Sequence, residues 1–246
     1  MNLVELVPHD PTELLGNAKD VLANYPAVSG INVPDILSVM YRSHDACSWL
    51  LEHNITAIPH IRCIDRPMDE TLGLVRNLVQ KGLKHVLIVS GDKPNSLSHP
   101  TFPITPTHIV SELKKEYGKD LFVYCGLDPY RYSFRQELEY CESKLLAGTD
   151  GFFTQPFFDK DLVRIYLEQL AGSTLFIGIS PVLTERSLNY WITKNNAIFP
   201  RSFALDLQTN CEIAKEIITM AEQFNQNTYT MPIKAPLWEY LDGIFK

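Results

Sequence analysis

The most constraining feature of this 246-residue sequence is a repeated alternation of short apolar runs with longer segments of helical period. The runs are rich in Val, Ile and Phe and about 4–8 residues long, as expected for strands buried on both faces of a parallel sheet. About eight strand–helix units in this length predict an α/β fold, a (β/α)8 TIM barrel. The apolar runs are Leu3–Val7, Val28–Val33, Thr56–Cys63, His85–Ser90, Leu121–Cys125, Gly151–Thr154, Leu175–Ile179 and Thr228–Met231.

Amphipathic segments between these runs are expected to form helices. Ser133 is a candidate N-cap and Gly148 a C-cap signal for one of them. No Pro/Ser-rich linker divides the chain, so residues 1–246 are read as a single barrel domain. Residues 196–210 lack clear periodicity, and the closing strand is expected near Tyr229. The predicted helices are Thr12–Asn24, Asp69–Lys81, Ser133–Ala147, Asp159–Leu170 and Thr184–Asn195.

Composition narrows the function classes. The formal net charge of −7 argues against a nucleic-acid binder, which usually has a basic face. No apolar run approaches the roughly 18 residues of a membrane span, and residues 1–11 do not read as a signal peptide, so we expect a cytoplasmic protein. The 5 cysteines are widely spread without CxxC spacing, which predicts reduced thiols and no metal site.

Several polar residues fall where strands of such a barrel would end, which is where barrel active sites lie. Glu5 stands inside an apolar run, a costly place for a carboxylate unless it is paired, protonated or at a site. Asp92 follows Gly91 after the fourth run, at the expected mouth. Gln155 lies among phenylalanines, which suits hydrogen bonding and stacking of a flat heterocycle. Structural explanations stay open: an interior ion pair for Glu5, a cap for Asp92, and a satisfied structural role for His60.

Taken in order, these segments resemble the methylenetetrahydrofolate reductase family. The resemblance spans nearly the whole chain, and its most specific parts are the Gly-Asp turn and the Thr-Gln-Pro-Phe-Phe-Asp run. Two substitutions stand out, with Ser90 and Lys234 at positions where the family has Arg. The matching segments are Val4–Pro8, Ile58–Asp65, Ser90–Pro94, Lys144–Gly148, Thr154–Asp159, Ile177–Pro181 and Tyr229–Ala235.

The resemblance implies an FAD-containing oxidoreductase that reduces 5,10-methylenetetrahydrofolate to 5-methyltetrahydrofolate. Reduced flavin would deliver the hydride, and a nicotinamide nucleotide or a partner protein would supply electrons; self-association is left open. The implied catalytic residues are Glu5, as general acid, and Asp92. The implied substrate-binding residues are Gln155, Phe157, Phe158 and Lys234. The implied cofactor-binding residues are His60, Asp92, Asp128 and Lys144.

Departures from the family pattern keep two other functions open. Asp128-Pro129 stands where the family often has a His-Pro that contacts FAD, and residues 32–35 replace an aromatic-Gly-Ala stretch. One alternative is a flavin-free relative that binds folate and transfers a methyl group. The other is a non-catalytic barrel subunit of an electron-transfer complex.

Overall fold

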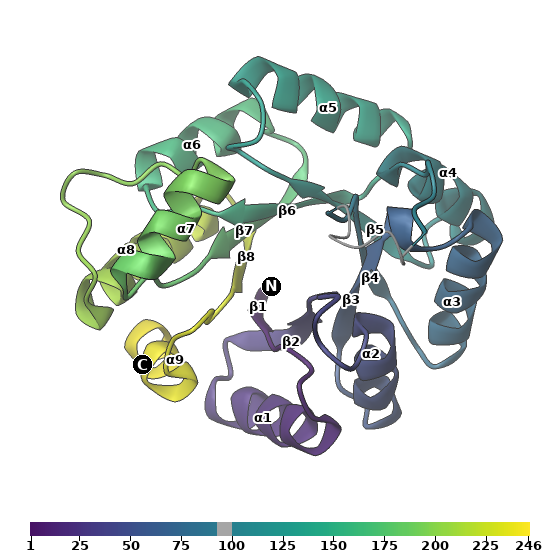
Figure 1. Cartoon of the computed structure of the whole chain (residues 1–246), viewed down its shortest axis with the longest axis horizontal. Coiled ribbons are helices and arrows are strands. Elements are labelled where there is room, and N and C mark those ends of the chain that lie inside the picture. Colours follow the sequence, from purple (N-terminus) through teal and green to yellow (C-terminus); the bar gives the residue numbers. More distant parts are fainter. Residues whose placement is uncertain (93–99) are drawn as a thin grey trace.

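Eight short strands pair in chain order, each parallel to the next, until the last pairs with the first and closes a barrel (Figure 1). The computed structural model describes residues 1–92 and 100–246. The predicted TIM barrel is therefore confirmed. The strands are β1 (Asn2–Glu5), β2 (Val28–Val33), β3 (Ala57–Arg62), β4 (His85–Val89), β5 (Phe122–Leu127), β6 (Gly151–Pro156), β7 (Thr174–Ile179) and β8 (Asn227–Thr230).

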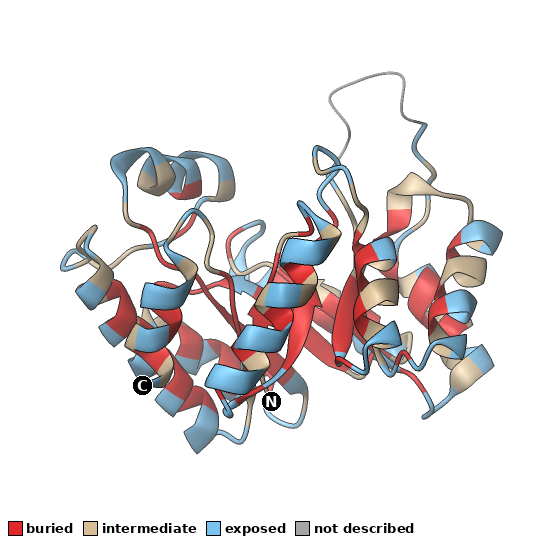
Figure 2. Cartoon of the chain, turned by 90° about the horizontal axis from the view of Figure 1, so that it is seen from below, coloured by how far each residue is buried: buried red, intermediate tan, exposed pale blue. Residues whose placement is uncertain are grey.

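Helices surround the barrel and turn their buried faces toward the strands (Figure 2). Between β7 and β8 the chain forms two helices, and the second of them, α8, packs against both strands. The helices of the described residues are α1 (Pro11–Asn24), α2 (Ser43–Glu52), α3 (Met68–Gln80), α4 (Pro106–Tyr117), α5 (Phe134–Leu146), α6 (Lys160–Gln169), α7 (Glu185–Asn195), α8 (Leu207–Gln223) and α9 (Leu237–Phe245), with a 3-10 turn at Cys63–Asp65.

The predicted helix boundaries are explained by local capping. The Ser133 hydroxyl accepts a hydrogen bond from the backbone N–H of Gln136, whose side chain bonds back to Ser133, forming a capping box. Asp159 and Thr184 likewise cap α6 and α7 with their side chains. Gly148 follows α5 with a φ of 101°, a left-handed conformation that glycine adopts without steric cost.

Two separate cores follow from the period-two alternation of the strands. Residues of one parity fill the barrel interior, and residues of the other parity pack outward against the helices. Tyr124 and Phe153 lie at the centre of the interior, where Phe153 stacks on Phe176 with ring centroids 4.1 Å apart. The interior core consists of Leu3, Ile58, Leu87, Tyr124, Phe153, Phe176, Tyr229 and Met231.

The remaining expectations concern membranes, thiols and metals. Within the described residues, none of the helices has the length and apolar character needed to span a bilayer. The 5 cysteines are buried and free. Across residues 1–92 and 100–246, no group of three or more His, Cys, Asp or Glu side chains is arranged to hold a metal. Lys93 and Pro94, which form part of the Gly-Asp turn motif, lie outside the described residues.

Candidate active site

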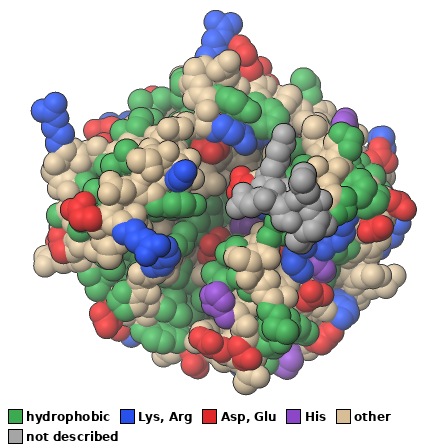
Figure 3. All heavy atoms as spheres, viewed as in Figure 1, with side chains coloured by type: hydrophobic (Ala, Val, Ile, Leu, Met, Phe, Trp, Pro, Cys, Tyr) green, Lys and Arg blue, Asp and Glu red, His purple; other side chains and the backbone are tan. Residues whose placement is uncertain are grey.

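A cavity of about 430 Å³ opens at the carboxyl ends of the strands. Its floor is formed by the interior core, including Leu87, Phe153, Tyr229 and Met231. Figure 3 looks onto this end of the barrel and shows the hollow with hydrophobic side chains inside it. Polar side chains from the strand ends, the loops after them and helix α5 also line the cavity. They are Glu5, Asp35, His60, Arg62, Ser90, Asp92, Asp128, Arg131, Lys144, Thr154 and Gln155.

Glu5 ends β1 with its carboxyl group inside the barrel, on the same face as Leu3. The side chain is 9% exposed, and its Oε2 accepts a hydrogen bond from Nδ2 of Asn32 at 3.3 Å. Burial raises the pKa of Glu5 to about 8, and the Asn32 hydrogen bond opposes this rise only in part. Glu5 is therefore a protonated acid at neutral pH, able to give a proton to a bound ligand.

His60 contributes a neutral imidazole from β3. Its backbone N–H donates to the Ser43 hydroxyl at 2.9 Å, and that hydroxyl donates to the carbonyl of Val33 at 2.6 Å. Burial lowers the pKa of His60 to about 4, so the ring is uncharged at neutral pH. Within the described residues its buried Nε2 has no hydrogen-bond partner, which leaves one polar atom available to a ligand.

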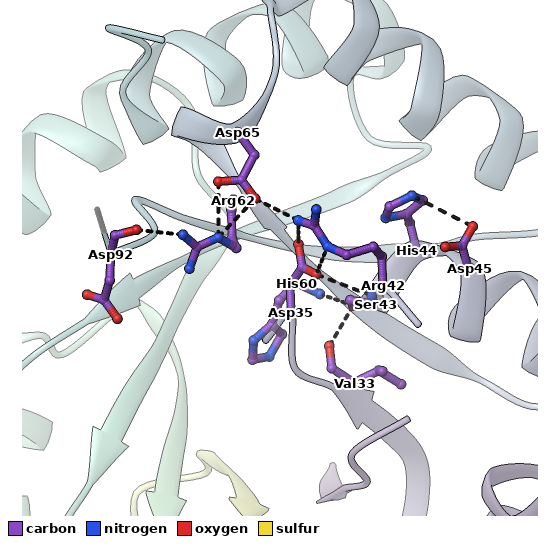
Figure 4. A network of polar contacts seen from close by, with 10 residues as sticks. All are labelled: Val33, Asp35, Arg42, Ser43, His44, Asp45, His60, Arg62, Asp65 and Asp92. Carbon is purple, nitrogen blue, oxygen red and sulfur yellow. Dashed lines mark hydrogen bonds and ion pairs between the residues drawn. The ribbon is translucent and has the colours of Figure 1, made fainter. Parts of the chain in front are cut away.

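A network of ion pairs joins the ends of β2 and β3 (Figure 4). Arg42 binds Asp35 through two hydrogen bonds of 2.6 Å and Asp65 through a third of 2.6 Å. Asp65 also accepts from Nε of Arg62 at 3.0 Å. Arg42 favours the ionised form of Asp35 and holds its pKa below the usual range despite burial, which acts in the opposite direction. The network fixes the mouth because paired charges tolerate burial that single charges do not.

Arg62 carries this network to the turn after β4. Its Nη2 donates to the backbone carbonyl of Asp92 at 2.6 Å, while the Asp92 carboxylate points away from the guanidinium (Figure 4). Gly91 has a φ of 83°, and a Cβ there would lie 3.0 Å from Cζ of Arg62. The glycine is therefore required both by the backbone conformation and by the close approach of the arginine. The turn leaves the exposed Asp92 carboxylate on the cavity wall.

The opposite wall, from β5 and α5, holds most of the remaining charge. Lys144 is 1% exposed and donates from Nζ to the carbonyl of Gly126 at 2.7 Å, and burial lowers its pKa. Burial also raises the pKa of Asp128, whose Oδ1 accepts from the backbone N–H of Tyr130 at 3.0 Å. Arg131 lines the same wall and approaches the buried Glu137 carboxylate at 3.4 Å.

Gln155 lies on β6 with the parity of Phe153, so its exposed amide points into the cavity. Phe157 and Phe158, in contrast, do not line it. Phe157 is 1% exposed in the outer core, and Phe158 is 2% exposed and stacks on Phe199 at 4.2 Å. They follow the end of β6, where strand alternation no longer directs side chains inward. Both side chains pack within the protein in this structure, and their contact with substrate stays a prediction.

Lys234 lies on an adjoining cavity of about 470 Å³, formed by the segments that follow β1 and β8. Glu5, Ile36 and Ile233 line both cavities, so the two cavities adjoin at these residues. Lys234 is exposed and has a φ of 52°, which places it in a turn. The structure thus brings together seven of the nine predicted site residues around two connected cavities. They are Glu5, His60, Asp92, Asp128, Lys144, Gln155 and Lys234.

Sequence reasoning singled out neither Arg42 nor Asn32 as a site residue. Arg42 is 23 residues from its partner Asp65, and no local motif signals a contact over that separation. A signal for Asn32 existed, since an amide between Ile31 and Val33 is unusual in a buried strand, as is a carboxylate in the first run.

Comparison with known proteins adds a family assignment. A family model described as methylenetetrahydrofolate reductase matches residues 25–225. The 5,10-methylenetetrahydrofolate reductase of Salmonella typhimurium is 26% identical over 187 residues, covering 70% of this chain and 62% of the relative. That of Escherichia coli is 25% identical over 159 residues, covering 60% of this chain and 53% of the relative. The chain thus matches between half and two thirds of the length of these curated relatives.

Solved structures with a similar fold are more distant in sequence. A 2,3-dimethylmalate lyase superposes with a TM-score of 0.63 at 10% identity, covering 99% of this chain and 79% of the other. Yersinia pestis DHPS, solved with a pterine-sulfa conjugate, gives a TM-score of 0.52 at 10% identity, covering 99% and 90%. These two likenesses concern the barrel alone. The family model, by contrast, spans most of the sequence, and this chain belongs to the methylenetetrahydrofolate reductase family.

Proposed function

We propose that this protein binds a tetrahydrofolate and reduces 5,10-methylenetetrahydrofolate to 5-methyltetrahydrofolate, with Glu5 as the general acid. The observation that carries the proposal is the buried carboxyl group of Glu5, whose pKa of about 8 keeps it protonated where two cavities meet. Membership of the family supports the reaction class.

Glu5 would donate its proton to the folate nitrogen that leaves the bridging methylene carbon. Opening of that carbon–nitrogen bond makes the carbon electrophilic, and proton donation by a positioned acid typically contributes 10²–10⁴-fold to the rate. The surrounding aliphatic and aromatic floor excludes water, which maintains the raised pKa between turnovers. Reduced flavin, when bound, would supply the hydride that reduces this carbon.

Gln155 and Asp92 would recognise the pterin ring. An amide and a carboxylate together offer both donors and acceptors to a flat heterocycle with ring nitrogens and an amino group. Both side chains line the cavity and are exposed, and neither forms a hydrogen bond with another side chain or backbone group of the described residues. Lys234 in the adjoining cavity would attract the carboxylates of the glutamate tail.

Two features of the same cavity support an FAD cofactor. Its apolar floor suits a flat ring system, and Lys144 and Arg131 supply positive charge for a diphosphate. Lys144 forms no ion pair with a carboxylate in the described part of the chain, so its ammonium group is available to an anion. His60 would hydrogen-bond the cofactor as a neutral group, and Asp128 would border it.

Asp128 also favours the second candidate, a flavin-free relative that binds folate and transfers a methyl group. A carboxylate at this wall repels a diphosphate, and Arg131 is partly committed to Glu137. Absorption spectroscopy of the purified protein, combined with titration of tetrahydrofolate, separates the candidates. The reductase requires a protein that retains or takes up flavin and binds folate. A colourless protein that binds folate but no added FAD would establish the second candidate instead.

A further inference from the structure

Glu5 and Asn32 form a polar contact in the barrel interior. The two residues lie opposite each other in the parallel register of β1 and β2, and Asn32 has no solvent exposure. Its Nδ2 donates to Oε2 of Glu5 at 3.3 Å. In residues 1–92 and 100–246, no other side chain forms a hydrogen bond or ion pair with the Glu5 carboxyl group.

Packing alone does not account for this asparagine. Its Oδ1 is buried and has no hydrogen-bond partner within the described residues, a cost that an apolar residue of similar size would avoid. Among the residues that the structure describes, its side-chain nitrogen makes one hydrogen bond, to Glu5. The free-energy cost of burying the unpaired Asn32 oxygen is therefore offset through the hydrogen bond to the Glu5 carboxyl group.

We propose that Asn32 is a positioning residue that determines which oxygen of Glu5 carries the proton and stabilises the carboxylate left after proton donation. An amide nitrogen can only donate, so the oxygen it contacts acts as the acceptor. Oε2 is therefore the acceptor, and Oε1 carries the proton. Once that proton has left, the same N–H bonds to an ionised oxygen and becomes stronger. This inference rests on the proposed function, in which Glu5 gives up a proton.

Other charges near Glu5 do not offer an equivalent contact. Tyr229, on the neighbouring β8, shares the barrel cavity with it, as do Asp35, His60, Asp92, Asp128 and Lys144, together with the arginines Arg62 and Arg131. The adjoining cavity adds His9, Asp10, Glu13 and Lys234. The side-chain bonds found for Asp35, Arg62 and Arg131 are to groups other than Glu5.

The test compares Asn32→Leu with Ser180→Ala, which removes another buried polar group that lacks a partner among the described residues. Ser180 follows β7, a strand that does not pair with β1, so the control matches the loss of a polar group but not the contact. Asn32→Thr, whose hydroxyl is too short to replace the amide, is the second variant in case the leucine prevents folding. Infrared titration of the Glu5 carboxyl band, identified by its loss in Glu5→Gln, reports the pKa without any substrate.

We expect both Asn32 variants to raise the pKa of Glu5 by about one unit, because the lost donor favoured the ionised form. Turnover should fall about tenfold with folate affinity changed less than about twofold, while Ser180→Ala leaves the pKa and turnover unchanged. The double variant Glu5→Gln/Asn32→Leu should have the same activity as Glu5→Gln alone, because Asn32 acts on catalysis through Glu5.

An unchanged Glu5 pKa in both Asn32 variants would overturn the inference, as would a full additional loss in the double variant. If the wild-type protein reduces no folate but the pKa still moves as expected, the proposed reaction fails while the control of Glu5 by Asn32 stands. The infrared measurement therefore separates the two failures.

Discussion

The two walls of the barrel cavity hold their polar groups in opposite ways. On the β1 to β3 side, burial holds Glu5 and His60 neutral, with pKa values of about 8 and about 4. The charges of that side lie in ion pairs, such as Asp35–Arg42 and Arg62–Asp65. On the β5 side, Asp128, Arg131 and Lys144 present charge close to the same space. The first wall is arranged to exchange a proton, and the second to attract or repel an ionic group.

This difference follows from which element of the fold carries each residue. Glu5 and His60 belong to strands and share the interior with apolar residues, so water is excluded around them. Asp128 and Arg131 lie on the loop after β5, and Lys144 reaches the cavity from helix α5. The proposed acid Glu5 is thus a strand residue, whereas the loop and helix after β5 bring charge to the same cavity.

The largest effect should come from removing the acid of the first wall. Glu5→Gln keeps the shape and the contact with Asn32 but has no proton to give, so turnover should fall about 100-fold or more. Folate affinity and the melting temperature should change little by comparison. Steady-state kinetics together with a binding titration measures both. If Glu5→Gln turned over within a few-fold of wild type, Glu5 would not be the general acid. The proposed contrast between a proton-donating wall and a charged wall would then fail.

The pH dependence of the reaction should report the titration of Glu5, which belongs to the same wall. A general acid must be protonated, so kcat/KM should be level below about pH 8 and fall tenfold per pH unit above it. His60, with a pKa of about 4, is already neutral and adds no change near pH 7. The residual activity of Glu5→Gln should lack the alkaline fall. A profile that instead rises through pH 8 would assign Glu5 the role of a base.

How far the sequence predicted these features depends on the range of the interactions involved. The strand positions, the Ser133 cap and the inward direction of Glu5 and Gln155 depend on local pattern, and the sequence contains that pattern. Helices α2, α4, α8 and α9 were not predicted. Residues 196–210 lack clear periodicity, which hid the start of α8 at Leu207 even though the Asp206 side chain caps it. The burial of Phe157 and Phe158 depends on tertiary packing beyond the end of β6, which the resemblance to the family did not show. The Arg42–Asp65 pair depends on tertiary contact alone.

A smaller effect is expected from Gln155, the recognition residue nearest the apolar floor. Gln155→Ala should weaken folate binding by about 0.5–1.5 kcal/mol, the usual contribution of one hydrogen bond to a neutral group. Stability should be unaffected because the side chain is exposed and makes no hydrogen bond to the described residues. Isothermal titration with tetrahydrofolate, with thermal melting as control, measures the two quantities. Unchanged affinity would place the pterin elsewhere in the cavity.

The smallest effect, and the sharpest test of the second wall, concerns Asp128. Of the two arginines downstream, Arg131 lines the cavity, whereas Arg135 is exposed and pairs with Glu139 at 2.9 Å. Arg131 is therefore the one placed to offset the charge of Asp128. If FAD binds along this wall, Asp128→His should tighten it roughly threefold, because a repelling charge is replaced by a donor at a partly solvated position.

Asp128→Asn separates the two contributions, since it removes the charge and keeps the size of the side chain. Fluorescence titration of FAD against wild type, Asp128→Asn and Asp128→His should give increasing affinity in that order. Loosening in both variants would mean that Asp128 holds Arg131 in place for the cofactor. If none of the three proteins binds flavin, a single carboxylate is not what excludes it. The second wall would then serve the folate alone, and methyl transfer without flavin would replace reduction as the proposed reaction.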